Sequence, residues 1–594
     1  MPLMGSLYVG ASGLTTNQNA LNTTAHNLSN IETTGYTRQQ VIQASKHYDT
    51  VGQAYVSSQQ VGLGVSYADV RSVRDYFLDK AYRQESGRSG YYDTTYNAIT
   101  EMETLFGELE GTAFQESLTE LINSVQELQK IPESATNQGL LVSKSQSFIE
   151  RAQAVYNGLA SYQDNINQQI TGTIDKINDY GHKIWDINQQ IQAIEVGGVE
   201  RANDLRDARD QMLDELGQLA KISYDEGIGG VVTVMLEGVE FVTQDYVNEM
   251  GYITGDVYNE KFAEDIAQGY KHAVADSFYV PTWPRYKDQE VFSTSEVISS
   301  DRNTDIGSLK ALYHARGNKR ATYRDLYPVG ESYPEFPNLN RITINGTEYI
   351  PTRDAAGHYN PIVNGGVTYN ISDEGIVTNA TTGEKIGSLS ISEGDSITLY
   401  ENTTRRSAIM NVMAEFDNLI HGIVTQMNDV LSPDGTNPLF ARISDKILDG
   451  TDGWTADNLM ISQSVQQAPS SLNNGFILEA DGSSIDQNTA DKLAALFSRQ
   501  FSELNPDTRT RLTYANYYVA LISENATAGN VCRSISENQQ ATVRSIDAQR
   551  QEVVGVSDSD ELTQMIRYQN AYNASSRYIN TVNAMLDTLL TSLT

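Results

Sequence analysis

Both ends of the chain repeat apolar residues at every seventh position. This spacing predicts helices that carry one continuous apolar seam, as in coiled coils. The spacing alone also fits an amphipathic helix that lies on an ordinary core. The seam positions are Leu7, Leu14, Leu21 and Leu28 near the N-terminus, and Met565, Tyr572, Ile579 and Leu586 near the C-terminus.

The distribution of charge favours the first of these interpretations. The chain of 594 residues has a formal net charge of -34, yet residues 1–66 are neutral overall and residues 562–594 carry +1. The residues between them therefore carry -35. Exposed coiled coils normally place charged side chains beside the seam. Their scarcity here indicates ends that pack on one another and on copies of themselves, while an acidic middle faces water.

These terminal helices are expected to be poorly ordered in a single isolated chain. Fixing the backbone of a segment of about 30 residues has a large entropic cost. Burying four leucines on one seam returns only part of that free energy. The two ends therefore need more buried area than one chain offers.

The middle of the chain alternates between helical and strand-like patterns. Apolar spacings of three and four predict a long helix over 139–195, a second one in "ERANDLRDARDQMLDELGQL", and others in "DIGSLKALYHAR", over 409–430 and over 512–550. Between them the period changes to two. "VVTVMLEGVEFV" predicts a hairpin that turns at Glu237-Gly238, and "RITINGTEYI" predicts one that turns at Asn345-Gly346.

The order of helices and strands predicts a mainly α fold with inserted β domains. Discontinuous N- and C-terminal coiled-coil-like helices would form an assembly domain, beside a helical rod and one or two β-rich domains. The expected division is residues 1–66 for the first half of the assembly domain, 67–223 for the first part of the rod, 224–306 for a β-rich insertion, 307–327 for a helical return, 328–403 for a variable β-rich insertion, 404–550 for the rest of the rod and 551–594 for the second half of the assembly domain.

No pattern in the sequence predicts a catalytic, cofactor or metal site. In "VGLGVSYADV" Tyr67 occupies the position of the third glycine of a phosphate-binding loop. "GASGL" lacks the last glycine of a nucleophile elbow. Four aspartates share a helix face between Asp204 and Asp214, but Arg206 and Arg209 stand among them. We interpret this face as a solvated, ion-paired surface rather than a cation site.

Composition excludes several other classes of function. Cys532 is the only cysteine, so neither an intrachain disulfide nor a cysteine-based zinc site is expected. The negative net charge argues against nucleic-acid binding. The apolar runs are too short to insert in a membrane, and no cleavable secretory signal is visible at the start of the sequence.

Several segments resemble flagellar axial proteins. "NLSNIETTGYTRQQV" is similar to the signature at the start of rod, hook and hook-associated proteins. "VGLGVSYADVRSVRDYFLDK", "ANDLRDARDQMLDEL", "FDNLIHGIVTQMNDVLSPDGTNPLF" and the C-terminal "GVSDSDELTQMIRYQNAYNASSRYINTVNAMLDTLL" resemble one group among them, the flagellar hook-associated protein 1 (FlgK) family. The likeness covers both ends and most of the middle, and it fails over about 328–402.

The resemblance implies a structural protein, not an enzyme, that joins hook to filament by helical self-assembly. It implies export through the flagellar type III gate to an extracellular flagellum. The implied partners are copies of itself, hook protein, hook-associated protein 3 and an export chaperone on the C-terminal helix. The eight seam residues would form the assembly interface, and the turn at Asn30, Thr34, Gly35 and Tyr36 would let the chain leave the inner tube.

Two alternatives stay open on the sequence. The chain could be another axial flagellar protein, either flagellin-like or a hook protein. It could also be a flagellar protein whose inserted domain binds a host or surface ligand. A surface enzyme is disfavoured because the insertion lacks paired histidines and any nucleophile motif.

Overall fold

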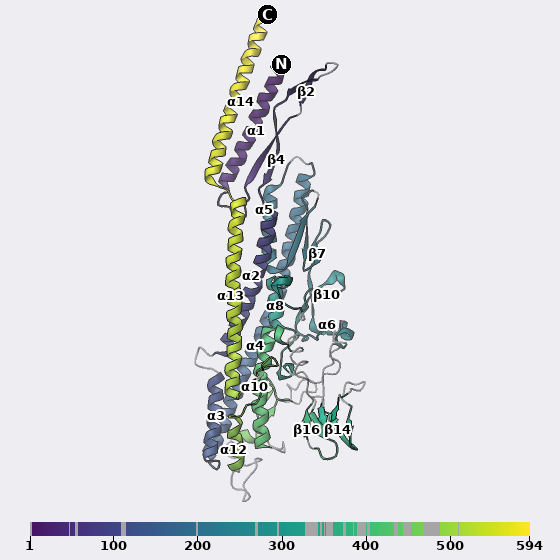
Figure 1. Cartoon of the computed structure of the whole chain (residues 1–594), viewed down its shortest axis with the longest axis vertical. Helices are drawn as coiled ribbons and strands as arrows, with labels where there is room; N and C mark the ends of the chain where they lie inside the picture. The colour runs from purple at the N-terminus through teal and green to yellow at the C-terminus, as the bar shows by residue number, and fades with distance from the viewer. Residues whose placement is uncertain are drawn as a thin grey trace. The chain divides into compact units, whose positions relative to one another are not determined.

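The chain folds into two compact units, which are described separately (Figure 1). Unit 1 comprises Met1–Gly90, Asp175–Glu249 and Glu537–Thr594, and unit 2 comprises Tyr91–Ile174 and Met250–Ser536. The computed structural model describes residues 3–46, 48–53, 58–107, 114–197, 200–227, 229–267, 271–293, 296–326, 342–344, 347–349, 351, 360–371, 376–383, 385–388, 400, 404–432, 438–443, 453–467, 487–508 and 510–593.

Helices dominate both units, as the sequence predicts. Among the described residues, no helix carries an apolar stretch that is long enough to cross a bilayer. The α-helices are α1 Leu3–Ser29, α2 Tyr76–Phe106, α3 Phe114–Lys130, α4 Ala135–Glu195, α5 Asn203–Leu219, α6 Gly255–Lys261, α7 Ala263–Ala267, α8 Ser308–Arg316, α10 Ala408–Leu431, α11 Gln463–Gln467, α12 Gln487–Leu496, α13 Tyr514–Val554 and α14 Asp558–Leu593.

The strands form small antiparallel sheets. The strands are β1 Gln39–Ser45, β2 Tyr48–Gln53, β3 Ser58–Gly62, β4 Val65–Ser72, β5 Ile222–Glu226, β6 Val232–Leu236, β7 Val239–Val242, β8 Gly251–Thr254, β9 Tyr279–Trp283, β10 Gln289–Glu290, β11 Ile342–Ile344, β12 Thr347–Tyr349, β13 Ile362–Asn364, β14 Val367–Ile371, β15 Ile376–Asn379, β16 Lys385–Ser388, β17 Phe440–Arg442 and β18 Leu459–Ile461. Their orders are β1-β4, β2-β3, β5-β6-β7, β10-β9-β8, β11-β12, β13-β14-β15-β16 and β17-β18.

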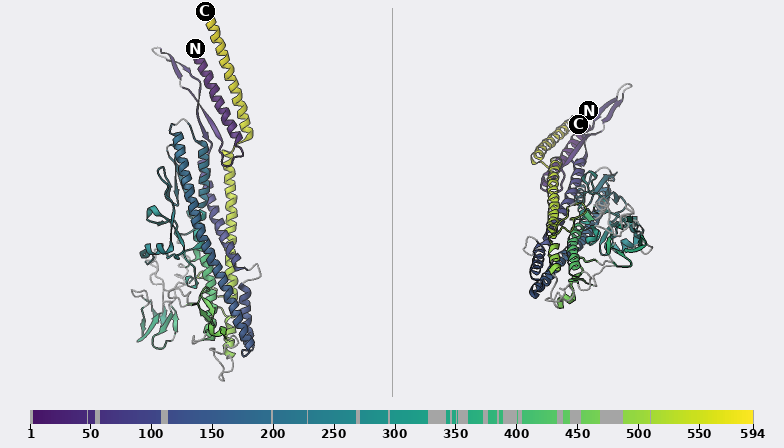
Figure 2. Two further views of the ribbon diagram at one scale, coloured as in Figure 1. Left: turned by 180° about the vertical axis from the view of Figure 1, so that it is seen from behind. Right: turned by 60° about the horizontal axis from the view of Figure 1, so that its bottom comes forward.

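Unit 1 contains both chain ends. Helices α1 and α14 lie side by side and run in opposite directions, as Figures 1 and 2 show. Strands β1 and β4 pair, and β2 and β3 pair beyond them, so that the chain between α1 and α2 forms a two-stranded ribbon. The sequence analysis did not predict this ribbon, because its strands are rich in Gln, Ser and Gly rather than in alternating apolar residues.

Both predicted hairpins form. Strands β6 and β7 pair around Glu237 and Gly238, which have φ values of 49° and 82°. Two successive positive φ values are the mark of the tight hairpin turn, and glycine adopts the second without strain. Strands β11 and β12 pair with Ile344 opposite Thr347. Its predicted turn, Asn345-Gly346, and much of the 328–403 insertion lie outside the described residues.

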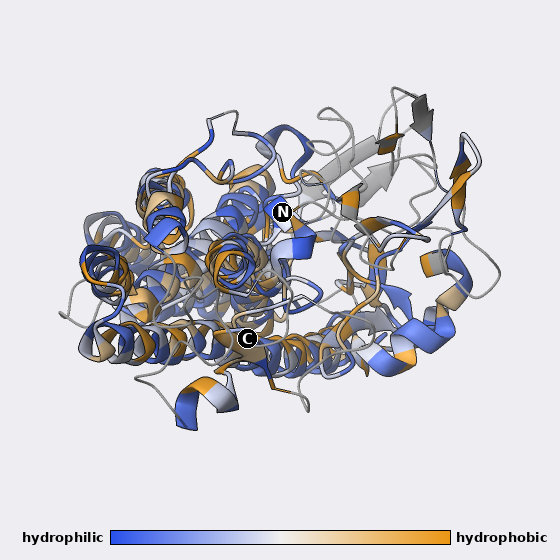
Figure 3. Cartoon of the chain, turned by 90° about the horizontal axis from the view of Figure 1, so that it is seen from below, coloured by the Kyte–Doolittle hydropathy of each residue, from blue (hydrophilic) through white to orange (hydrophobic). Residues whose placement is uncertain are grey.

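Unit 2 is held by a core of aromatic and aliphatic side chains. The ring of Phe114 lies 4.9 Å from that of Phe416 and 5.0 Å from that of Tyr518, which joins α3, α10 and α13. Strands β11 and β13–β15 share a separate small core that includes Ile344 and Val377. Around the helices in Figure 3, hydrophobic and hydrophilic residues alternate, as amphipathic helices require.

The predicted helices of the middle form close to their expected bounds. Helix α4 ends at Glu195, directly before the Gly197-Gly198 pair, and α8 covers the predicted "SLKALYHAR" segment. In α10 the residues of the predicted apolar face are buried, from Ile409 to Met427. The seven finer domain ranges of the sequence analysis stay predictions.

One interpretation of the sequence is wrong in part. The aspartate face of α5 is ion-paired, as the sequence analysis expects, but it is largely covered rather than solvated: Asp207 is buried, and of the four aspartates only Asp204 is exposed. Asp214 accepts hydrogen bonds from Arg83 Nε at 2.7 Å and from Arg550 Nη2 at 2.6 Å. Asp210 pairs with Arg83 at 3.1 Å and also with Arg74.

This buried network joins three separate stretches of the chain. Arg83 comes from α2, Asp214 from α5 and Arg550 from α13, and the Arg550 guanidinium also lies 3.3 Å from Asp79. Spacing along α5 could show that the carboxylates share a face. It could not show that arginines from two distant helices cover that face.

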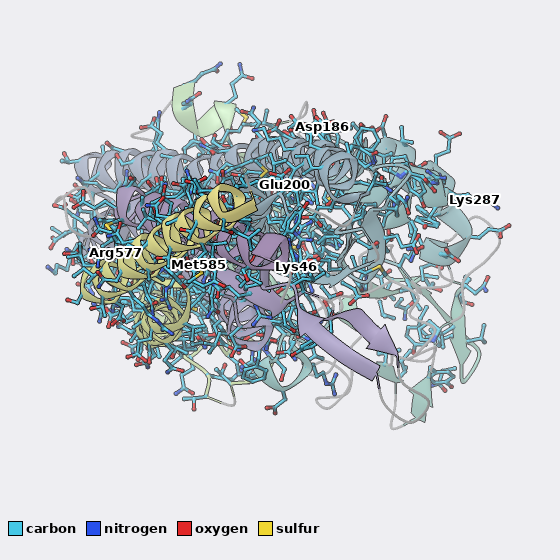
Figure 4. All side chains as sticks on the ribbon, turned by 90° about the horizontal axis from the view of Figure 1, so that it is seen from above. Lys46, Asp186, Glu200, Lys287, Arg577 and Met585 are labelled. Carbon is cyan, nitrogen blue, oxygen red and sulfur yellow. The ribbon has the colours of Figure 1, made fainter. Side chains whose placement is uncertain are left out.

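We predict that Asp214→Ala destabilises the protein by about 3 kcal/mol, because it removes the carboxylate that Arg83 and Arg550 share and leaves each buried guanidinium with one acidic partner, Asp210 or Asp79. Urea unfolding followed by circular dichroism measures this change. The matched control is Asp186→Ala on α4, since Asp186 is exposed (Figure 4) and its loss should change stability by less than about 0.5 kcal/mol. Equal effects of the two variants would contradict the network.

Unit 2 contains a pair of carboxyl groups that one amide bridges. Asn505 donates to Glu415 Oε1 at 2.8 Å and lies 3.2 Å from Glu524 Oε2. Burial raises the pKa of Glu415, and the nearby Glu524 carboxylate raises it further. The folded protein therefore holds the Glu415 proton more tightly than the unfolded chain does. This carboxyl supports folding fully below the ordinary glutamate pKa of about 4.3 and loses that effect as pH rises through the raised value.

We therefore predict that Glu415→Gln, which stays neutral, becomes more stable relative to the wild type as pH rises. At pH 8 its melting temperature should be a few degrees higher, at roughly 2–4 °C for each kcal/mol gained. At pH 4 the difference should nearly vanish. Glu116→Gln, at an exposed position of α3, is the control and should show no such trend. A difference between Glu415→Gln and wild type that does not change with pH would contradict the prediction.

Candidate functional site

The candidate site is the pair of terminal helices together with the turn that follows α1. The centre of the contact between α1 and α14 is made by small residues. A Cβ atom at Gly10 would lie 2.7 Å from Ile579 Cγ1, and one at Gly13 would lie 3.0 Å from Ser575 Oγ. Only glycine therefore lets the Ile579 side chain pack this closely on α1 at Gly10. The buried positions of α1 are Ser6, Gly10, Ser12, Thr16, Ala20, Thr24 and Asn27.

The predicted seam residues lie at this contact but are not covered by it. All eight of them are half-buried: Leu7, Leu14, Leu21, Leu28, Met565, Tyr572, Ile579 and Leu586. The small buried residues Ser6, Gly10, Thr16, Ala20 and Thr24 form a stripe along α1. At about 100° per residue, the four leucines fall on the flank of this stripe rather than at its centre. Heptad spacing predicted the two helices, but it did not predict that small residues would lie at the centre of their contact.

The helix pair has almost no hydrophobic core of its own. Among the described residues of α1 and α14, the apolar side chains that are fully buried are those of Ala20 and Val582. Large apolar side chains are instead exposed, with Tyr8 at 67% and Ile566 at 59%. Met585, labelled on α14 in Figure 4, is 54% exposed. Most of the apolar surface of this pair is thus left for other contacts.

The turn after α1 has a defined hydrogen-bonded structure. The Thr33 amide donates to the Asn30 carbonyl at 3.0 Å, and the Tyr36 amide donates to the Thr33 carbonyl at 3.2 Å. Gly35 has a φ of 80°, in the left-handed region that favours glycine. The predicted turn residue Thr34 is exposed. The backbone hydrogen bonds do not depend on residue type, whereas the positive φ favours glycine at position 35.

Asn27 and Tyr36 fasten this turn to the ribbon. The Tyr36 hydroxyl donates to Asn27 Oδ1 at 2.8 Å and lies 3.0 Å from His26 Nδ1. Asn27 in turn accepts from the Gln39 amide at 3.0 Å and donates to the Gln39 carbonyl at 2.9 Å. Burial, together with Asp204 and Asp207, raises the pKa of Tyr36, so its hydroxyl stays protonated and able to donate. Sequence reasoning missed Asn27, although it stands in the quoted signature.

Polar contacts then connect the turn with the rest of unit 1. The Thr37 amide donates to Asp207 Oδ2 at 2.9 Å. Arg38 pairs with Glu561 at 2.8 Å, and its amide donates to the Val554 carbonyl at 2.8 Å. Burial raises the pKa of Asp207 to about 6, against the lowering effects of Thr37 and Arg74. The exit of α1 and the start of α14 are therefore held at one place.

The interactions at this site are helix packing, hydrogen bonds and ion pairs within the chain. Among the residues that the structure describes, no group of three or more His, Cys, Asp or Glu side chains is arranged to hold a metal ion. Glu561 binds Arg38, and Asp207 accepts from the Thr37 amide. The arrangement can fix the direction in which a helix pair leaves a body.

Comparison with protein families divides the chain into three matching parts. The family described as the flagellar hook-associated protein FlgK helical domain matches residues 99–278. The flagella basal body rod protein family matches residues 7–37, which include the exit turn. The flagellar basal body rod FlgEFG protein C-terminal family matches residues 548–592, which include most of α14.

Curated relatives extend the likeness over nearly the whole chain. Flagellar hook-associated protein 1 of Bacillus subtilis is 23% identical over 586 residues, with 98% of this chain and 96% of that protein covered. The protein of the same name from Salmonella typhimurium is 22% identical over 593 residues, with 98% of each covered.

A solved structure was also compared with the chain. The flagellar hook junction protein FlgK from Burkholderia pseudomallei has a TM-score of 0.42 and 13% identity, and it covers 80% of this chain and 100% of its own. That score is too low to show a shared fold. In sequence, the chain is similar to flagellar hook-associated protein 1 over nearly its whole length, and its residues 99–278 match the FlgK helical domain family.

Proposed function

We propose that this chain is a structural subunit of the bacterial flagellum that joins hook to filament by assembling through its terminal helices. The observation that carries the proposal is the incomplete burial of α1 and α14. A pair of helices whose fully buried apolar side chains are Ala20 and Val582 gains little from burial in one chain. Neighbouring subunits would cover the half-buried leucines and the exposed Ile566 and Met585.

The scarcity of charge on these helices supports the same proposal. Equivalent helices of many copies can lie close together only when like charges do not repel. The turn after α1, at residues 30–36, would set the angle between the assembled helices and the outer body. In this proposal Asn30, Gly35 and Tyr36 shape the turn, and Asp207 and Glu561 hold it.

The partners and the location follow from the proposed role. The subunits would contact copies of themselves, hook protein on one side and hook-associated protein 3 on the other, in the extracellular flagellum. An export chaperone would cover the exposed face of α14 before export. No enzymatic step is part of this role. The 328–403 segment would be an insertion that assembly does not need.

We predict that the purified monomer loses its ends to protease while its body resists. The reason is that the α1 and α14 pair buries too little apolar surface to offset backbone entropy. Limited proteolysis followed by mass spectrometry should remove roughly 40 residues from each end. Protection of Leu7 through Leu28 in dilute monomer would contradict this expectation.

We further predict that Leu21→Asp prevents assembly without destabilising the body. Leu21 is half-buried in one chain, so the melting temperature of the monomer should not change. In the assembled layer the new carboxylate would be buried among helices, at a cost of several kcal/mol. Cells that carry the variant should export it and should shed flagellin into the medium. Electron microscopy of flagella and blotting of the medium measure these effects.

The control for this experiment is Asp186→Ala, whose side chain is exposed on α4. Asp210→Ala is unsuitable, because Asp210 belongs to the buried network with Arg83. The control strain should carry normal filaments. If Leu21→Asp lowers the monomer melting temperature by many degrees while filaments stay attached, α1 is a core element and the assembly proposal is wrong.

A further inference from the structure

Unit 1 contains a groove that the assembly role described above does not use. Its volume is about 670 Å³, and it lies where the C-terminal turns of α1, the base of the ribbon and the start of α5 meet. Val70, Ile194 and Leu205 supply apolar surface, and His26, Gln39 and the 200–204 segment supply polar groups. No described residue of α14 lines it.

Two carboxylates in this groove lack a basic partner. Glu200 and Asp204 are both exposed, and within the described part of the chain neither forms an ion pair. Asp204 accepts one hydrogen bond, from Gln39 Nε2 at 3.2 Å. The remaining acid in the lining, Asp69, already pairs with Arg201 at 3.4 Å. The acidic and basic residues of the lining, Asp69, Glu200, Arg201 and Asp204, therefore sum to a charge of -2.

The outward face of α14 has the complementary character. Arg567 and Arg577 are exposed on this helix and form no ion pair among the described residues. At about 100° per residue, both lie more than roughly 100° around the helix from Ile579, which faces α1. The exposed Ile566 and Met585 lie on the same broad face. Figure 4 shows Arg577 and Met585 on α14, and Glu200 elsewhere on the unit.

We propose that the outward face of α14 in one copy docks into the groove of a second copy, with its arginines paired to Glu200 and Asp204. This proposal rests on the assembly function above and names the surface that would receive the helix. Apolar residues would meet Val70, Ile194 and Leu205, while the charges neutralise one another. A guanidinium group suits this role because it pairs bidentately with a carboxylate.

The geometry of this contact suits an open assembly. The two surfaces are different parts of one molecule, so each copy still offers a free groove and a free helix after one contact has formed. Such a heterologous contact propagates into rings or helical tubes, whereas a contact between identical patches closes as a dimer. The chain's own surfaces thus favour growth over dimer formation.

Charge reversal with rescue tests the proposal in the source bacterium. One variant carries Glu200→Arg and Asp204→Arg, the second carries Arg567→Glu and Arg577→Glu, and the third combines all four changes. Each of the first two should reduce the number of attached filaments by about tenfold, because like charges would then meet in the contact. The combined variant should restore most filaments, since the charges again oppose each other.

Matched controls separate a lost contact from a lost fold. Asp225→Arg with Asp245→Arg changes the net charge equally at exposed sites outside the groove and should leave filament numbers unchanged. Glu200→Gln with Asp204→Asn removes the charges with little change of shape and should give an intermediate defect. Melting of each purified monomer should match the wild type.

The outcomes are distinct. Loss in both reversed variants, with rescue in the combined one, supports the docking proposal. The proposal is overturned if either reversed variant has normal filaments or if the combined variant shows no rescue. It is also overturned if the neutral variant has a lowered melting temperature or if the control shows an equal defect. The junction function is tested separately by deleting the whole gene. If the deletion strain loses its filaments and the wild-type chain restores them, the junction function is supported even where the docking proposal fails. Failure of that restoration would instead overturn the junction function.

Discussion

The hydrogen bond between the Thr37 amide and Asp207, with the ion pair between Arg38 and Glu561 beside it, is the contact on which the arrangement of the ends depends. It brings the exit of α1, the aspartate face of α5 and the start of α14 to one point. Charged groups are costly to bury, and they are tolerated here because each has a partner. The network around Arg83, Asp214 and Arg550 extends the same principle into the body of unit 1.

The terminal helices differ from the rest of the chain in how little apolar surface they bury. Unit 2 buries large aromatic side chains such as Phe114 and Phe416, and α10 buries most of one face. The α1 and α14 pair meets instead through Gly10, Gly13 and Ser575. Side chains of α14 pack closely on the two glycines, while large apolar residues such as Ile566 and Met585 stay exposed. A stable body and an incompletely covered pair of ends are the combination expected of a subunit that completes its core by assembly.

Sequence reasoning predicted those features that depend on local patterns. The long helix that ends at Glu195, the turn at Glu237-Gly238 and the two terminal helices all follow from spacing or from backbone preference. It failed where the result depends on partners distant in sequence. The α5 aspartates appeared solvated because nothing along that helix indicates that Arg83 and Arg550 cover them. The ribbon was missed because pairing, rather than alternation, forms its strands, and Asn27 was missed because its two contacts reach Gln39 across a turn.

The two residues of the ion pair that holds the terminal helices, Arg38 and Glu561, come from opposite ends of the sequence. Arg38 and Glu561 are 523 positions apart, so the ion pair cannot form until almost the entire polypeptide is present on the same side of any passage through which it moves. A chain cut short before Asp558 would have α1 and the exit turn but no α14 to pack against Gly10. A molecule that lacks either end therefore cannot form the helix pair.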